Sequence, residues 1–416
     1  MPRLTYQYAY GSESEVRYRN HADLDQRLRD EQLVLMPQLN GFIVYRPTNW
    51  LESKLALTMD REMLVRGDRT IELPSGETEQ RPRDTNSFLI DEAFVTLHGF
   101  TDPFSLTVGR RNYEDERHWL YDTSLDIAAI GFREGRFRAE ASFGREVLVN
   151  LDAFRRQRDD RINTYMFYAD YRAFEDVKFA AYTIVRDDLG NVDGRAHLYG
   201  VRTQGSPIAG FTYWTDLALL RGRDEASRSF DGYGFDIGGT YRFLGLPLSP
   251  NITLAYAYGS GDKNPNDNAN RQFRQTGLQS NEQKFAGLSE FRRYGEALDP
   301  ELSNLSILTV GVGFRPFRNV SLDFIFHDYR LNAVAEGLRN SAVTAEMNQD
   351  ASQPSKDVGS AFDIVLGFRN VFGVQRLGVD LRMGKFFPGN AFRNEQDNGD
   401  FVKADSAAAV VAKIWW

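Results

Sequence analysis

Apolar and polar residues alternate along most of this sequence, in segments of about ten residues that recur from one end to the other. A period of two predicts β-strands, because successive side chains of a strand point to opposite faces. Eighteen such segments can be delimited. They cover residues 4–12, 33–44, 50–59, 88–98, 104–111, 124–132, 136–145, 162–170, 177–186, 197–203, 211–220, 232–242, 252–259, 305–314, 320–329, 361–369, 375–386 and 407–416.

The links between these segments alternate in length. Every second link is short and turn-like, such as RPTN at 46–49 and NVFG at 370–373. The others are longer and polar, and the longest span residues 60–87, 260–304 and 330–360. A soluble sandwich gives no reason for this segregation, whereas an outer-membrane barrel has tight periplasmic turns and long extracellular loops. The pattern predicts one all-β domain over residues 1–416, a transmembrane antiparallel β-barrel of about eighteen strands, with residues 260–304 on the extracellular side.

The two faces of each predicted strand differ as the wall of such a barrel requires. In residues 136–145, Phe137 and Phe143 share one face, whereas Arg138 and Glu140 share the other. An antiparallel sandwich would also show this alternation. In a barrel the apolar face meets lipid, the charged face lines a lumen, and no strand edge is left unpaired.

The end of the chain fits a closing strand of this kind. Ala408, Val410, Ile414 and Trp416 share one face of the last segment, which ends on two tryptophans. We expect this face to meet lipid and the tryptophan pair to lie at the membrane interface, where aromatic residues are enriched. A terminal aromatic residue also resembles the assembly signal of bacterial outer-membrane proteins.

Composition excludes several other classes of protein. No run approaches the ~18 apolar residues of a membrane helix, so a helical membrane protein is excluded. There is no cysteine, hence no disulfide and no thiolate metal site, and the net charge of −8 does not fit a nucleic-acid binder. The opening MPRLTYQYAY is not a signal peptide. We therefore expect Met1 to be an added start on a mature chain.

Five stretches carry a resemblance to a known family. They are VGRRNYEDERHWLYDT at 108–123, FRQTGLQSNEQKFAG at 273–287, RRYGEALDPELSNLSILTVG at 292–311, KDVGSAFDIVLG at 356–367 and MGKFFPGNAF at 383–392. They resemble the alginate-export family of outer-membrane porins, and residues 275–305 are the most specific part. The resemblance implies a monomeric barrel of eighteen strands that passively exports an anionic exopolysaccharide. It also implies an arginine-lined constriction, partly covered by an extracellular loop and a long periplasmic loop.

Partners follow from the same resemblance. They are an anionic polysaccharide, outer-membrane lipid and lipopolysaccharide, and a periplasmic secretion scaffold. No nucleic acid, cofactor, metal ion or catalytic residue is expected. The turn NVFG is far too short to be the family's periplasmic loop.

The resemblance and strand parity together nominate pore residues. Positions that match or adjoin the family's basic lining are Arg110, Arg292, Arg293, Arg382 and Lys385, and Asp122 matches an acidic pore residue. Glu92, Asn112 and Glu282 fall where alginate exporters carry arginine. Strand parity adds Arg111, Arg136, Arg138 and Lys178 to the predicted lumen face. Parity favours Arg111 over Arg110, so a bulge between them is an open alternative.

Three functions stay open at this point. The first is export of an anionic exopolysaccharide, in which arginine suits carboxylates through its bidentate fork. The second is an uptake porin for small anionic or sugar solutes, because the predicted lumen is only slightly basic. The third is an outer-membrane enzyme, for which Asp323 and His327 share a face but no nucleophile is nominated. The polar loop 261–270 lacks the ligand order of a calcium loop.

Overall fold

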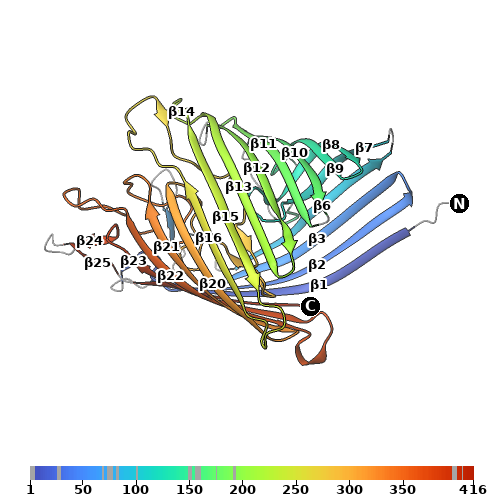
Figure 1. Cartoon of the computed structure of the whole chain (residues 1–416). Helices are drawn as coiled ribbons and strands as arrows, with labels where there is room; N and C mark the ends of the chain where they lie inside the picture. Colours follow the sequence, from blue (N-terminus) through green and yellow to red (C-terminus); the bar gives the residue numbers. More distant parts are fainter. Residues whose placement is uncertain are drawn as a thin grey trace.

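A computed structural model describes residues 5–25, 30–67, 70–72, 78–80, 84–99, 102–148, 152–154, 161–174, 176–190, 194–395, 401–404 and 406–416. Eighteen long strands form one closed antiparallel barrel (Figure 1). They are β1 (Thr5–Asn20), β2 (Gln32–Thr48), β3 (Leu51–Arg66), β6 (Asp84–His98), β7 (Phe104–Glu114), β8 (Asp122–Glu134), β9 (Phe137–Arg145), β10 (Ile162–Phe174), β11 (Val177–Asp188), β12 (Arg195–Ile208), β13 (Phe211–Arg223), β15 (Gly232–Arg242), β16 (Asn251–Gly259), β20 (Leu305–Phe317), β21 (Val320–Leu331), β22 (Asp357–Arg369), β23 (Gly378–Pro388) and β26 (Ala407–Trp415).

The barrel closes where the last strand meets the first. β26 pairs with β1 from Glu13↔Trp415 to Asn20↔Ala408, and with β23 on its other side. Each of the eighteen predicted segments overlaps one barrel strand. The predicted barrel of about eighteen strands is confirmed.

Short and long links gather at opposite ends of the barrel. We call these the turn end, where for example β8 meets β9, and the loop end, where β21 meets β22 after residues 332–356. Smaller elements lie in the links. These are β4 (Thr70–Glu72), β5 (Thr78–Gln80), β14 (Ser229–Phe230), β17 (Ala269–Asn270), β18 (Glu282–Gln283), β19 (Phe291–Arg292), η1 (Val371–Gly373), β24 (Arg393–Glu395) and β25 (Phe401–Lys403). In the described part of the chain, no helix has the length and apolarity needed to cross a membrane.

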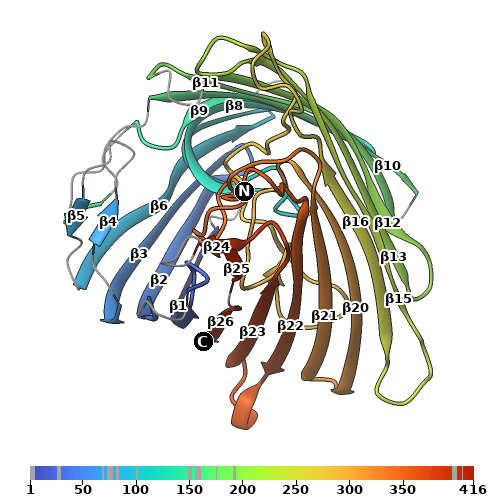
Figure 2. The ribbon, with the colours of Figure 1, turned by 90° about the vertical axis from the view of Figure 1, so that its left-hand side faces the viewer.

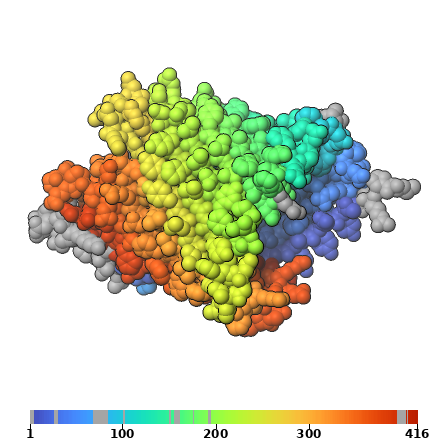
Figure 3. All heavy atoms as spheres, viewed as in Figure 1, coloured from blue at the N-terminus to red at the C-terminus, as the bar shows by residue number. Residues whose placement is uncertain are grey.

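The wall of the barrel has an apolar outside and a buried, partly charged inside. On β13 and the neighbouring β15, Leu217, Leu219 and Ile237 are exposed on the outer face, whereas Asp216 and Asp236 are buried inside. Figure 3 shows the green to yellow strands of this side as an unbroken outer wall. A continuous apolar exterior of this kind fits lipid, because in water it would be an aggregation site.

The seam between the first and last strands is uneven. Trp416 exchanges two backbone hydrogen bonds with Ser12, and β26 pairs with β1 only from Glu13 onward. Residues 5–11 of β1 therefore pair with β2 alone among the described strands. Trp416 lies outside against Tyr10, with ring centroids 5.8 Å apart. Trp415 instead faces inward, with the Arg369 guanidinium 4.4 Å from its ring, so the expected interface position of the whole pair is wrong.

Candidate functional site

Residues 273–304, here called the inner loop, fold into the barrel instead of staying outside it (Figure 2). Strands β18 and β19 pair through Glu282↔Arg292. The tip between them, residues 284–290, reaches the turn end of β20–β23. There the Arg315 guanidinium donates hydrogen bonds to the carbonyls of Ala286 (2.8 Å) and Gly287 (2.9 Å). The expectation that all of residues 260–304 are extracellular is therefore wrong for the inner loop, which spans the depth of the lumen.

Tight packing holds the tip in place. Phe291 packs with Ile325 and Val365 of the wall, and Phe285 joins them with its ring 4.8 Å from that of Phe291. The lack of a Cβ on Gly367 permits the closest approach, since a Cβ there would lie 2.3 Å from the Ser289 hydroxyl oxygen and would displace it. Close packing of this kind is typical of a protein core, so the tip is a fixed part of the structure and not a loose lid.

Buried charges also attach the inner loop to the wall. Arg382 of β23 is only 7% exposed and lies 3.4 Å from Glu282 and 3.6 Å from Glu296. Burial would raise the pKa of Glu282, yet Arg292 and Arg382 together lower it. For Glu296 the balance differs: burial raises the pKa of this carboxyl to about 7 despite Arg382. Buried ion pairs of this kind fix geometry, and breaking one partner is costly.

A second cluster joins the inner loop to residues 115–121, the link between β7 and β8. Arg117 pairs with Asp216 and with Asp236 (3.3 Å), and Arg293 of the inner loop lies 3.6 Å from Asp236. Burial, with Arg117 nearby, lowers the pKa of Arg293 to about 10. On the same link, the Trp119 indole donates to the Tyr294 hydroxyl at 3.0 Å. The two links therefore form one partition inside the barrel.

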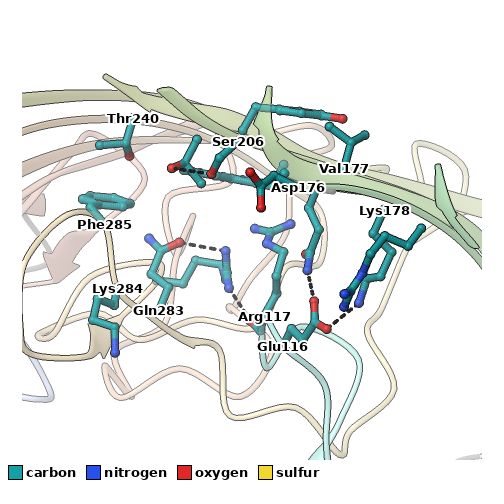
Figure 4. Close-up of a pocket in the computed structure, with 17 residues that line it drawn as sticks. Glu116, Arg117, Asp176, Val177, Lys178, Ser206, Thr240, Gln283, Lys284 and Phe285 are labelled. Atoms are coloured by element: carbon teal, nitrogen blue, oxygen red, sulfur yellow. Dashed lines mark hydrogen bonds and ion pairs between the residues drawn. The ribbon is translucent and has the colours of Figure 1, made fainter. Parts of the chain in front are cut away.

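The partition leaves β3 and β6–β13, here called the open half, with two chambers. The first has a volume of about 770 Å³ and contains ion pairs along the wall. Arg111–Glu140 (2.8 Å) reaches from β7 past β8 to β9, and Arg138–Asp170 (3.1 Å) joins the neighbouring β9 and β10. The second, of about 470 Å³, lies between β10–β13 and the inner loop (Figure 4). Its basic lining residues are Arg117, Arg172, Lys178, Lys284 and Arg293, against the acidic Glu116 and Asp176.

Behind the inner loop lies the packed half of the lumen, bounded by β20–β23 and β26. A cavity of only about 250 Å³ remains there, lined by Arg382, Glu282 and Lys413 among others. At the loop end, a further cavity of about 360 Å³ is lined by Arg186, Arg274 and Arg339. Open volume and surplus basic charge coincide in the second chamber, not in the packed half.

The predicted pore residues fall into three groups. Arg111, Arg138 and Lys178 line the open half, and Arg293 lines the second chamber. Arg292 pairs with Asp299 (3.4 Å) within the inner loop, and Arg382 attaches that loop to the wall. The other four do not line the two chambers: they are Arg110, Asp122, Arg136 and Lys385.

Each of these four has a defined place. Arg110 lies on the face opposite Arg111, 3.4 Å from Asp126, so parity was the better guide. Arg136 lies in the exposed turn before β9, bonded to the carbonyl of Ala173 at 2.9 Å. Lys385 is wrong as a lumen residue: it is exposed on the outer face of β23, 5.2 Å from the Phe387 ring.

Asp122 belongs to a small group at the loop end. Glu114, His118 and Asp122 bring potential metal ligands within 4.8 Å of one another. The Nε2 of His118 lies 3.0 Å from Glu114, however, while its Nδ1 lies 3.7 Å from Asp122. Opposite ring nitrogens cannot bind one ion together, so this group is better described as a histidine between two carboxylates.

Sequence reasoning missed Glu116, Arg117 and Arg202 as lumen residues. Glu116 and Arg117 lie in a stretch that resembles the alginate-export family, but neither that resemblance nor strand parity places them in the lumen. Arg202, fully buried between Asp115 (2.5 Å) and Asp216, sits on the inner face of β12. Alternation along β12 could have found Arg202, whereas the inward fold of residues 115–121 has no periodic signal.

Comparison with known proteins agrees with this architecture. The alginate export family matches residues 3–401. The chain is 23% identical over 402 residues to the alginate production protein AlgE of Pseudomonas syringae pv. tomato, covering 82% of this chain and 78% of that one. It is 28% identical over 184 residues to AlgE of Azotobacter vinelandii, but spans only 37% of that protein's length.

Solved structures of the same fold are porins. Pseudomonas aeruginosa OccK2 (OpdF) matches with a TM-score of 0.60 and 11% identity, over 99% of this chain and 97% of that one. OpdK with vanillate, from the same species, matches with a TM-score of 0.59 and 12% identity, over 99% of both chains. Sequence identities this low support a shared fold and nothing more. With a family match over nearly its whole length and a lipid-compatible barrel, the chain belongs to the alginate export family and is a β-barrel of the bacterial outer membrane.

Proposed function

We propose that this protein is a passive export channel for an anionic, alginate-like polysaccharide, which passes through the open half of the lumen. The observation that carries the proposal is the second chamber, whose lining has five basic and two acidic residues. Arg117 and Arg293 are paired with acids behind the lining, whereas Arg172, Lys178 and Lys284 complete its basic set. Membership of the alginate export family supports the same substrate class. The two named relatives are alginate production proteins, which agrees with it.

The chemistry of passage follows from the lining. A polyuronate presents one carboxylate per sugar, and lysine or arginine along the path can bind each in turn. Conduction needs several weak sites, because one tight site would hold the polymer. Partly exposed pairs, such as Arg111–Glu140, contribute only about 0–1 kcal/mol each, so they suit a path on which contacts are made and broken.

A second function, uptake of small anionic or sugar solutes, is favoured by one specific observation. The partition divides the lumen into chambers of about 470 and 770 Å³, which is the size range of small-molecule sites. Acidic residues outnumber basic ones in the first chamber, which suits a neutral sugar better than an anion. We further expect a monomer surrounded by lipid and lipopolysaccharide, and a periplasmic secretion scaffold as partner if the substrate is a polymer.

Ion selectivity in planar bilayers tests the proposal. Under a potassium chloride gradient, the wild-type channel should show a reversal potential that favours anions. Lys284→Glu in the second chamber should reduce this preference, and 1 M salt should mask the difference, because it shortens the screening length to about 3 Å. Lys385→Glu makes the same charge change on the outer face and should leave the reversal potential unaltered.

Polymer passage separates the two functions. Liposomes containing the protein should release an oligouronate faster than a neutral oligosaccharide of equal length. Release of monosaccharide acids without oligouronate would favour uptake of small solutes. A wild-type channel selective for cations would overturn both anionic functions and leave the barrel fold untouched.

A further inference from the structure

Glu116 and Lys178 occupy a special place in the open half. Among the described residues, they are the two that line both chambers. Glu116 lies in the link after β7, and Lys178 is the second residue of β11. The Lys178 ammonium is 2.5 Å from one carboxylate oxygen of Glu116, and the Gln204 amide donates to the other (Figure 4). The ion pair therefore stands at the junction between the chambers.

The side chains of Glu116 and Lys178 differ in their exposure to solvent. The next residue, Arg117, is held by Asp216 and Asp236, so the backbone beside Glu116 is anchored. The Glu116 side chain is nevertheless 54% exposed, whereas that of Lys178 is 11% exposed. Breaking the pair would expose a solvated carboxylate at little cost but would leave a largely buried ammonium without its partner. The pair is easy to open only when something else neutralises Lys178.

We propose that Glu116 and Lys178 form an ion-pair gate between the two chambers, which a carboxylate on the substrate opens by replacing Glu116 on Lys178. For its substrate class this inference rests on the proposed function. The replacement exchanges one carboxylate–ammonium pair for another and makes or breaks no covalent bond. A neutral sugar offers no charge for Lys178 and leaves the gate closed. The gate thus selects carboxylates at the point where both chambers meet.

Other charges near the junction do not substitute for the pair. Arg172 and Asp176 line the second chamber alone, and Asp170 lines the first. Arg111–Glu140 also lies within the first chamber alone. These groups provide comparison sites, since a change of lumen charge away from the junction should act differently from a change at it.

Chloride conductance of single channels tests the gate without any polymer. Glu116→Gln should raise conductance about twofold, because it removes the carboxylate that pairs with Lys178 and keeps the gate closed. Glu140→Gln, the same change inside one chamber, should raise it less. Asp187→Asn, which removes a carboxylate paired with Arg195 (2.7 Å) at the end of the same strand as Lys178 but outside both chambers, should leave it unaltered.

Reversal of the pair distinguishes a gate from a simple gain of positive charge. Glu116→Lys combined with Lys178→Glu restores the pair with opposite polarity and should return conductance to the wild-type value. Heat-modifiable gel mobility would confirm that each variant is a folded barrel. Equal effects of Glu116→Gln and Glu140→Gln, or a folded double variant that stays at the Glu116→Gln level, would overturn the gate.

The outcome for the gate is separate from the outcome for the substrate. If wild-type channels release no oligouronate but Glu116→Gln still doubles chloride conductance, the gate stands and polymer export fails. If oligouronate is released and the variants at residues 116 and 140 behave alike, export stands and the gate fails.

Discussion

The two halves of the lumen use the same kinds of residue under different conditions. Arg382 in the packed half is 7% exposed and touches two carboxylates of the inner loop. Arg111 in the open half is 33% exposed and touches Glu140 alone among its ion-pair partners. A buried ion pair is costly to break and therefore fixes the geometry, whereas an ion pair in contact with water can exchange partners. Water access, more than the number of basic residues, decides which arginines can serve a moving substrate.

Removing the tip of the inner loop should break the distinction between the halves most completely. Replacing residues 284–290 with a two-glycine turn removes Phe285 and the backbone carbonyls that Arg315 binds. The packed half would open to water at the turn end, and single-channel conductance should rise about twofold or more. A folded variant with wild-type conductance would mean that the tip blocks nothing.

Alanine at one arginine in each half should show a large difference in stability. Arg382→Ala leaves Glu282 and Glu296 without their wall partner in a buried site, and should lower the free energy of unfolding by about 3 kcal/mol. Arg111→Ala should lower it by about 0–1 kcal/mol. Urea titration followed by tryptophan fluorescence in detergent measures both. Equal losses of the free energy of unfolding would show that water reaches the ion pairs of both halves equally.

Stability should also depend on pH through the packed half. Because the pKa of Glu296 is about 7 in the folded protein against 4.5 normally, the native state retains a proton that the unfolded state has lost between these values. The free energy of unfolding should therefore fall as pH rises through this window. Glu296→Gln should flatten this part of the profile, whereas Glu140→Gln should not. Identical slopes in wild type and Glu296→Gln would contradict the assignment.

Locking the tip should have the smallest effect on transport. The chain has no cysteine, so Ser289→Cys with Gly367→Cys would introduce one defined pair between the tip and the wall. A Cβ at residue 367 would lie 2.3 Å from the present position of the Ser289 hydroxyl oxygen, so the side chain at residue 289 must turn slightly to reach disulfide geometry. If the inner loop is a fixed partition, oxidised and reduced channels should conduct equally. Conductance that returns only on reduction would show that the loop must move.

Much of this architecture could be predicted because lipid on one side of every strand imposes a strict period of two. Residues such as Leu217 and Ile237 are apolar for that reason alone, and all eighteen strands were found from it. Lys385 was misplaced because a motif match was preferred to parity: Arg382 and Phe386 face inward, so residue 385 must face out.

The depth of the inner loop was beyond such reasoning. Several contacts of its tip are made by backbone carbonyls, as in the contact of Arg315 with Ala286, and any residue type can supply a carbonyl. The Glu116–Lys178 pair joins a residue of the irregular link after β7 to a residue of β11. A period of two says nothing about where such a link folds.

The uneven seam sets how deep the barrel sits in the membrane. Residues 5–11 of β1 expose one edge of backbone amides and carbonyls that no described strand covers. Hydrocarbon cannot solvate those groups, so that stretch must stand in water or among headgroups. The boundary of the hydrocarbon layer at the seam therefore falls near Ser12, beside the rings of Tyr10 and Trp416. These two aromatic residues mark the membrane–water interface at this end of the barrel.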